Sequence, residues 1–205
     1  ENQLNRLSRT LRRALSAGLP LTPLQPCRLG IVSNATSHFL VPALEATAVR
    51  HGLALQCIEA DYGQIMQEAL SPDSTINRAQ ADAVLIAIDH RGLLLRPVPG
   101  EADVAQRTVE ATLAQLTIMR DGLHKNGNTV CIVPTLPHPV ESVFGSHDAI
   151  VPGSMRNLID SINRGIVESV VGTQDVLLDV AHLAQTLGLA EWHNPTLWNM
   201  AKLPF

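Results

Sequence analysis

The fold is decided by the stretch Arg28-Leu-Gly-Ile-Val-Ser-Asn-Ala-Thr-Ser37, in which an apolar run stops at Ser33-Asn34. The run over 29–32 is typical of a buried strand, and apolar residues then recur at helical spacing over 39–51. A strand that gives way to a helix through small polar residues brings a hydroxyl, an amide side chain and free backbone N–H groups to the edge of a sheet. In open α/β folds ligands bind at this edge, so Ser33 is the first residue that we expect to take part in chemistry.

The rest of the chain alternates regularly between strand and helix patterns. We expect strands at 27–33, 53–59, 83–88, 129–133 and 176–178, and helices at 37–51, from about 63, at 102–125, at 153–171 and from 180. This alternation indicates an α/β protein with a parallel sheet and helices on both faces. Because crossovers between parallel strands are right-handed, a five-stranded, doubly wound sheet is the economical topology.

The first 26 residues differ in character from the remainder of the chain. Leucines at 4, 7, 11 and 15 stand among arginines at the spacing of an amphipathic helix. The Pro-rich segment 19–26 then excludes helix and favours an extended connector. We therefore expect a helix and connector over 1–26 and one α/β domain over 27–205.

Composition excludes several classes of partner. The 205-residue chain is 45% hydrophobic and 17% charged, with a formal net charge of -4. A mildly acidic surface gives no reason to expect binding to nucleic acid or to an anionic membrane. The apolar runs are shorter than a membrane span, and the first residues lack the hydrophobic region of a signal peptide.

The cysteines and histidines argue for a reducing compartment and against a metal site. Cys27, Cys57 and Cys131 lack the spacing of a metal or disulfide motif, which indicates buried thiols in a cytoplasmic protein. The eight histidines include no HxH or HExxH pattern, so we expect no metal. His138 and His147 lie in a Pro-rich loop, where we expect both to be exposed.

Polar residues come after the predicted strands and should gather at one edge of the sheet. The fifth strand leads to the segment 191–195, and the first four lead to Ser33–Thr36, Glu59–Gln64, Asp89–Arg91 and Pro134–His138. Within the second of these, Asp61 could line a pocket beside Tyr62 or cap the next helix. The convergence of these segments, rather than one residue, predicts a site.

One interpretation of the site is nucleophilic acyl transfer, which needs a hydroxyl, an imidazole, an orienting group and N–H donors for an oxyanion. Ser33 would be the nucleophile and His193 the base. Asn34 and backbone N–H groups would stabilise the oxyanion, and Asp89 or His90 would supply a further polar partner.

The alternative interpretation is structural. Ser33 would satisfy the strand-to-helix turn by capping the next helix, as Thr36 and Ser37 also could. His193 would lie at a loop-to-helix junction, with Asn194 as the cap of a helix that begins at the next residue, a proline.

Several segments, in this order, resemble the amino-terminal domain of FkbH-like proteins. They are Ser33–Thr36, Ala60–Gln64, Ser71–Ser74, Ala83–Asp89, Phe144–Asp148 with Pro152–Ser154, and Trp192–Phe205. The resemblance covers nearly the whole chain after about Pro26. It implies an SGNH-hydrolase-like, flavodoxin-type, three-layer domain.

The resemblance also implies a biosynthetic context. FkbH-like proteins pair this domain with a haloacid-dehalogenase-type phosphatase domain, which loads a glyceryl unit onto an acyl carrier protein in polyketide or nonribosomal peptide assembly. The Asp-x-Asp motif of that second half is not in this sequence. We therefore expect an amino-terminal half that has no cofactor of its own, meets the phosphopantetheine arm of a carrier protein, and is normally followed by the phosphatase domain.

Set against the SGNH pattern, the candidate residues are partly changed. Ser33 stands at the nucleophile block, but Ile31-Val-Ser-Asn34 replaces the usual Gly-Asp-Ser. Gly63, between Tyr62 and Gln64, takes the place of the oxyanion glycine. Asp89-His90 stands at the Gly-x-Asn-Asp block without its asparagine, and His193 lacks the aspartate three residues earlier, where Ala190 stands. Asp89 or a backbone carbonyl would have to orient the base instead.

We consider three functions as hypotheses. The first is a degenerate SGNH-type domain that docks a carrier protein or supports the phosphatase half. The second is an active serine esterase, thioesterase or acyltransferase that uses Ser33 and His193 on a carrier-bound acyl group. The third is a small-molecule domain that binds phosphopantetheine or phosphate at the same edge.

Overall fold

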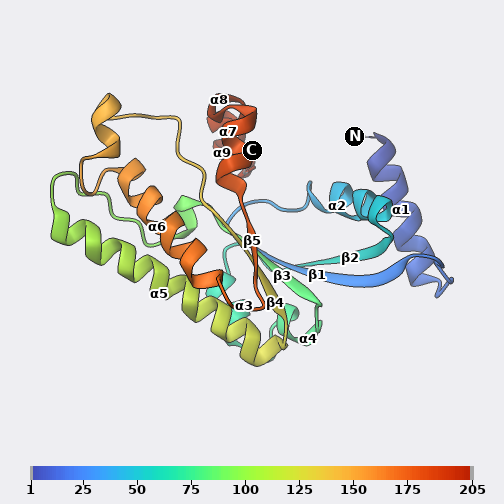
Figure 1. The fold of residues 1–205 in the computed structure, drawn as a ribbon. Helices are drawn as coiled ribbons and strands as arrows, with labels where there is room; N and C mark the ends of the chain where they lie inside the picture. Colours follow the sequence, from blue (N-terminus) through green and yellow to red (C-terminus); the bar gives the residue numbers. More distant parts are fainter. Residues whose placement is uncertain (1, 204–205) are drawn as a thin grey trace.

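The sheet has the predicted architecture. In a computed structural model, which describes residues 2–203, five parallel strands lie in the order β2-β1-β3-β4-β5, with helices on both sides (Figure 1). The strands are β1 (Gln25–Ser33), β2 (Leu53–Glu59), β3 (Ala83–Ala87), β4 (Val130–Pro134) and β5 (Val176–Leu178). This order is that of flavodoxin-like folds, so the predicted α/β class is confirmed.

The helices keep the predicted alternation, with shorter pieces added. Those after β5 are α7 (Val180–Leu187), α8 (Leu189–Trp192) and α9 (Pro195–Ala201). The earlier helices are α1 (Asn2–Ser16), α2 (Val41–Ala48), α3 (Ile65–Leu70), α4 (Thr75–Arg78), α5 (Ala102–Gly127) and α6 (Met155–Val170). Three 3-10 turns, η1 (Val49–His51), η2 (His90–Gly92) and η3 (Gly145–Ala149), complete the set. The predicted helix from 37 begins instead at Val41, with η1 as its last turn.

The late start of α2 also corrects the predicted caps. Ser37 donates its hydroxyl to Glu59 over 2.6 Å, and Thr36 donates its hydroxyl to the Ala201 carbonyl over 2.6 Å. Neither residue caps α2, whose N-cap is Leu40 without a side-chain bond. The prediction for Asn194 is confirmed, because its side chain accepts the N–H groups of Thr196 and Leu197 at the start of α9. Asp61 does not cap α3, whose N-cap is Gln64.

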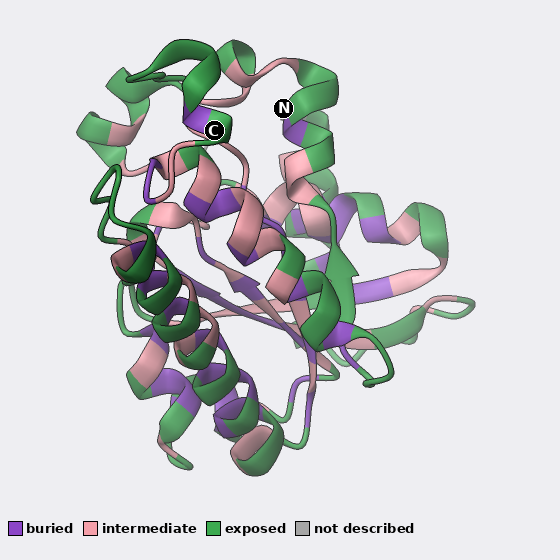
Figure 2. Ribbon diagram, turned by 60° about the vertical axis from the view of Figure 1, so that its left-hand side comes forward, coloured by how far each residue is buried: buried purple, intermediate pink, exposed green. Residues whose placement is uncertain are grey.

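The two faces of the sheet are covered unequally. Val84 and Ile86 of β3, and Cys131 and Val133 of β4, are buried in the main core with residues of α5 and α6. The alternating residues of β3, such as Leu85, are only half-buried. Since neighbouring strand residues point to opposite faces, one face of β3 is buried and the other is half-buried. The long helices carry both buried and exposed residues, as expected of helices that cover a sheet (Figure 2).

Helix α1 is anchored to α2 by one buried carboxylate. Glu45 of α2 is 1% exposed and accepts the Ser8 hydroxyl over 2.7 Å and the Arg12 Nε–H over 2.7 Å. The Cys57 N–H donates to its other oxygen over 3.3 Å. Strand β1 begins at Gln25, two residues before its predicted start at 27, and the division into 1–26 and 27–205 stays a prediction.

A second buried carboxylate joins β5 to α5. Asp175 accepts Arg120 Nε–H over 2.8 Å and the Cys131 N–H over 2.9 Å, and it lies 2.8 Å from His124 Nε2. The donor atoms of His124, Cys131 and Asp175 lie within 4.8 Å of one another, as in a metal site. Because Arg120 already neutralises the carboxylate, we assign this cluster a structural role.

Among residues 2–203, no helix combines the length and the apolar character that a membrane span requires.

Replacing Asp175 by alanine is expected to lower the free energy of unfolding by about 3–5 kcal/mol, because it leaves the Arg120 guanidinium buried without its counter-charge. Urea unfolding monitored by circular dichroism measures the change. Asp73→Ala is the control, since Asp73 is exposed, and it should stay within about 0.5 kcal/mol of the wild type. Equal effects of the two changes would contradict the role given to Asp175.

Candidate functional site at the carboxyl edge of the sheet

A pocket of about 270 Å³ lies on the open face of the sheet, where the strands end. Its floor comes from Leu85 and Ala87 of β3 together with Pro134 and Leu178 of the neighbouring strands. Helices α2 and α7 form its sides, with apolar contributions from Leu40, Leu44, Val180 and Leu183. The pocket is therefore a largely apolar groove between two helices, and we call it the groove.

Five of the eight predicted site residues line the groove together: Ser33, Asn34, Asp89, His90 and His193. They come from the ends of β1 and β3 and from the segment between α8 and α9. Ser33 lies opposite Ala87 in the parallel register of β1 and β3, which brings the two strand ends side by side. The expected convergence is thus present for four of the five polar segments but not for Glu59–Gln64, and the roles of the residues remain predictions.

The other three predicted residues lie apart from the groove. Tyr62, Gly63 and Gln64 are exposed and do not line it. The Gly63 N–H donates to the Ser33 carbonyl over 3.3 Å. That N–H group is therefore engaged in joining the first two strand ends, and the groove gives no support to Gly63 as an oxyanion donor.

The Ser33 hydroxyl is used within its own turn. Its Oγ accepts the N–H of Ala35 over 2.9 Å, and the residue is 8% exposed. This bond closes the turn in which the chain leaves β1. Among residues 2–203 no hydrogen bond joins Ser33 to a histidine ring.

Asp89 is the centre of the polar network. Asn34 Nδ2–H donates to Asp89 Oδ1 over 2.7 Å, and the Asp89 N–H donates to Asn34 Oδ1 over 3.0 Å. Arg91 donates its backbone N–H to Oδ1 over 2.8 Å and its Nη1–H to Oδ2 over 2.7 Å. Burial acts to raise the pKa of the Asp89 carboxyl, but the hydrogen bonds from Asn34 and Arg91 outweigh it and lower that pKa below its usual value.

The candidate base is held by Arg91 and not by Asp89. Arg91 Nη2 lies 2.9 Å from His193 Nε2, and the guanidinium stacks over the Trp198 ring with 4.4 Å to the centroid. Because a guanidinium can only donate, His193 Nε2 must be the accepting nitrogen. The lone pair that would take a proton from a hydroxyl is thereby occupied.

Two more histidines line the groove. Burial lowers the pKa of His90, which favours the neutral ring. The predicted exposure of His138 is wrong, because its side chain is 16% exposed and its Nε2 lies 2.8 Å from Asp160 Oδ1 of α6. His147 is exposed, as predicted.

The sequence analysis placed Arg91 and His138 in polar segments after strands, but it did not give the partners of these residues, His193 and Asp160. A lone arginine two residues after an aspartate gives no signal of a partner 102 residues away. The hint in the sequence was that Arg91 and His138 each lie in a polar segment after a strand.

The carboxyl-terminal segment lies against the first loop of the site. The Thr36 N–H donates to the Lys202 carbonyl over 2.9 Å, and the Thr36 hydroxyl donates to the Ala201 carbonyl. Lys202 Nζ lies 5.3 Å from the Trp198 ring centroid, on the same ring that contacts Arg91. The segment that carries His193 is therefore fixed at its carboxyl-terminal end.

Comparison with solved structures defines the class of fold. An acetyl xylan esterase, AlAXEase, aligns with a TM-score of 0.50 and 12% identity over 86% of this chain and 90% of that one. A GDSL-like lipase from Bacteroides thetaiotaomicron aligns with a TM-score of 0.47 and 16% identity over 97% of this chain and 90% of that one. The α/β fold of this chain is thus similar to that of the acetyl xylan esterase.

The family is narrower than this class. The model of the FkbH N-terminal domain matches residues 28–205, so the chain belongs to that family. The N-terminal part of the protein BF1531 from Bacteroides fragilis, described as containing a phosphatase domain complexed with Mg, aligns with a TM-score of 0.81 and 13% identity. The alignment covers 100% of this chain and 51% of that one, so this chain spans about half the length of that relative. No curated protein matches the sequence.

The replacement Asn34→Ala is expected to raise the pKa of the Asp89 carboxyl, because the charged form loses a hydrogen bond. In the wild type the lowered pKa of Asp89 stabilises the folded state above about pH 4, the usual pKa of an aspartate. This stabilisation is lost as the pH falls through the lowered pKa of the folded state. Carboxyl-carbon NMR measures the titration. Asn5→Ala, on the outer side of α1, is the control, and an Asp89 titration that is unchanged in the Asn34 variant would contradict the network.

Proposed function

We propose that this domain binds the acyl-carrying arm of a carrier protein in the groove and so supports glyceryl loading, without itself breaking an acyl bond. The FkbH family is the reason for proposing a carrier protein as the partner. The groove is the reason for proposing that the domain binds the arm of that partner. The observation that carries it is the contact between Arg91 and His193, which occupies the ring nitrogen that would have to accept the Ser33 proton.

The shape and lining of the groove fit a linear, mostly uncharged chain. Its volume of about 270 Å³ is close to the lower end of the roughly 300–1,000 Å³ that is typical of small-molecule sites. Leu44 and Leu183 face it from opposite helices and would contact methylene groups. Polar groups are gathered at the strand ends, where amides or hydroxyls of an arm could find hydrogen-bond partners.

The charges at the groove suit a neutral ligand better than an anionic one. The guanidinium of Arg91 is paired with the Asp89 carboxylate over 2.7 Å, so little net positive charge faces the groove. Burial keeps the neighbouring His90 largely neutral through its lowered pKa. A glyceryl or other acyl thioester would meet these requirements, whereas a free phosphate would lack a cationic partner.

The catalytic groups support binding more than turnover. Serine catalysis needs a base that accepts the hydroxyl proton, and an orienting acid behind that base. Asp89 is bonded to Arg91 and Asn34, and Arg91 rather than an acid holds His193. Arg91 thus stands between the carboxylate of Asp89 and the ring of His193. An acid would orient the imidazole for catalysis, whereas the guanidinium donates to its lone pair.

A second candidate is an active serine acyl-hydrolase or acyltransferase. The observation in its favour is that Ser33, Asn34 and His193 line the same groove. For this activity Arg91 would have to leave His193, so that Nε2 could accept the Ser33 proton while Oγ attacked the acyl carbonyl. Asn34 has a second N–H with which to bond the oxyanion.

The cytoplasm is the compartment that we propose for this function. All three cysteines are free, and burial raises the pKa of Cys57 and of Cys131 to about 12, which keeps both thiols protonated and unreactive.

The change Leu183→Glu is expected to weaken binding of an acyl-pantetheine at least tenfold, because it places a charge in the apolar wall of the groove. Leu183 is 48% exposed, so folding should be preserved. Leu187→Glu is the matched control, since this residue lies on the same helix, is 64% exposed and does not line the groove. Isothermal titration calorimetry measures the affinity of both variants for acyl-pantetheine. An equal loss of affinity in the two variants would contradict binding in the groove.

Catalysis is tested with a fluorophosphonate probe. We expect the wild type to remain unlabelled while Ser33→Ala keeps its affinity for acyl-pantetheine within about twofold. Labelling of the wild type that disappears in Ser33→Ala would instead establish the second candidate function.

A further inference from the structure

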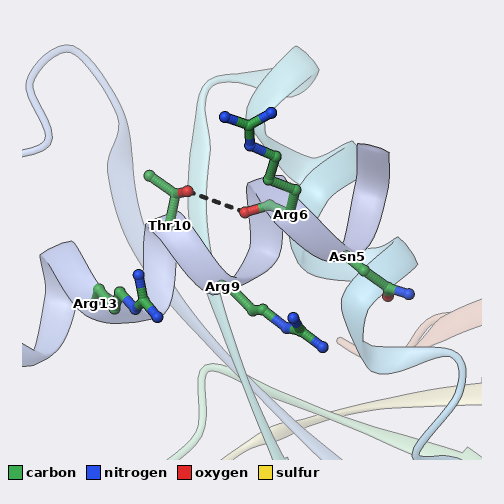
Figure 3. A pocket seen from close by; sticks show the side chains of 5 residues that line it. All are labelled: Asn5, Arg6, Arg9, Thr10 and Arg13. Atoms are coloured by element: carbon green, nitrogen blue, oxygen red, sulfur yellow. Dashed lines mark hydrogen bonds between the residues drawn. The ribbon is translucent and has the colours of Figure 1, made fainter. Parts of the chain in front are cut away.

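We propose that the outer face of α1 is the docking surface for an acidic helix of the carrier protein. The inference rests on the proposed function and deepens it, since it names where the partner sits while its arm occupies the groove. The surface consists of Arg6, Arg9 and Arg13, with Asn5 and Thr10 between them, and we call it the basic face (Figure 3).

The arginines of the basic face point to solvent. All three are exposed, and an open hollow of about 540 Å³ lies among their side chains. The Thr10 hydroxyl donates to the Arg6 carbonyl over 2.9 Å, within the helix backbone (Figure 3). The opposite side of α1 carries Ser8 and Leu11, which are buried. Because Ser8 and Arg12 both bond Glu45, α1 is fixed in one rotation and presents the basic face outward.

The basic face has an uncompensated positive charge. Helix α1 contains four arginines and no acidic residue over Asn2–Ser16. Of these, Arg12 pairs with Glu45, whereas Arg6, Arg9 and Arg13 form no ion pair with any residue of the part described, 2–203. Like charges three and four residues apart repel one another along a helix. Carboxylates from a partner would relieve this repulsion, in a chain whose overall charge is -4.

The spacing of the three arginines specifies the shape of that partner. Positions 6, 9 and 13 run along one side of the helix for two turns, or about 10 Å along its axis. A second helix with Asp or Glu at the same three- and four-residue spacing would match them, because a guanidinium fork can pair with both oxygens of a carboxylate.

Other anionic partners fit the basic face less well. Three arginines on an otherwise acidic chain make a small footprint for nucleic acid, which is normally bound by extended basic surfaces. A membrane-surface helix needs a continuous exposed apolar side. On α1, Leu4 and Leu7 are 40% exposed, but Leu11 is 7% exposed and packed inward, so the apolar surface is short.

The basic face also lies within reach of the groove. Helix α1 packs on α2, and α2 supplies Leu44 to the groove wall, next to its N-cap Leu40. Packed helix axes are about 8–10 Å apart, so a carrier protein on α1 would sit roughly one helix diameter away from the wall. Its flexible arm would then cross α2 to enter the groove.

The test is a titration of the whole chain with the holo acyl carrier protein of the same assembly line, at low and at physiological salt. The variant carries Arg6→Gln, Arg9→Gln and Arg13→Gln together. Its control carries Arg96→Gln, Arg107→Gln and Arg164→Gln, which make the same change in net charge at positions outside α1. Because exposed ion pairs are individually weak, we expect the α1 variant to bind roughly ten- to a hundredfold more weakly and the control to stay within about twofold.

A second titration, with pantetheine alone, separates the two proposals. We expect it to be the same for the wild type, the variant and the control, which also shows that the α1 variant is folded. If variant and control bound the carrier protein equally while pantetheine still bound, the docking role of the basic face would be wrong. The proposal for the groove would stand. Loss of both ligands in the wild type would overturn the proposed function as well. Tighter, arginine-dependent binding to a DNA duplex or to phosphatidylserine vesicles than to the carrier protein would overturn the choice of partner.

Discussion

The carboxylate of Asp89 is the group on which the arrangement of the site depends. Its bonds with Asn34 join the ends of β1 and β3, and its bond with Arg91 positions a guanidinium that reaches His193 and Trp198. The imidazole of His193, which lines the same groove as Ser33, is thereby bound to a cation. One arginine therefore links the carboxylate at the end of β3 to the imidazole of His193.

Stability and binding are divided between the two faces of the sheet. The core on one face, packed under α5 and α6, supplies most of the apolar burial. On the other face α2 and α7 stand apart, and half-buried residues of β3 remain accessible between them. The open face therefore offers space that the main core does not fill, and an exposed wall residue such as Leu183 can be changed at little cost to folding.

Local sequence patterns were sufficient to predict the strands of the sheet. They were insufficient to predict the side-chain contacts of the site. The strands at 53–59 and 176–178 have the predicted bounds, because each is a short apolar run between turn residues. The helix predicted from 37 was wrong at its start because Ser37 is bonded to Glu59 of another strand. His138 was expected to be exposed because its loop is Pro-rich, and a partner on α6 buries it. Such pairings depend on tertiary distances, which residue order does not contain.

The hydrogen bonds from Thr36 to the end of α9 have a consequence for any polypeptide joined there. They hold the segment at Lys202 beside the first loop of the groove, so a unit tethered at that point would start within a few residues of the ligand. A short tether converts an encounter in solution into an intramolecular one at an effective concentration that can reach the millimolar range. Under the proposed function, a ligand leaving the groove would then meet such a tethered unit faster than the same unit free in solution.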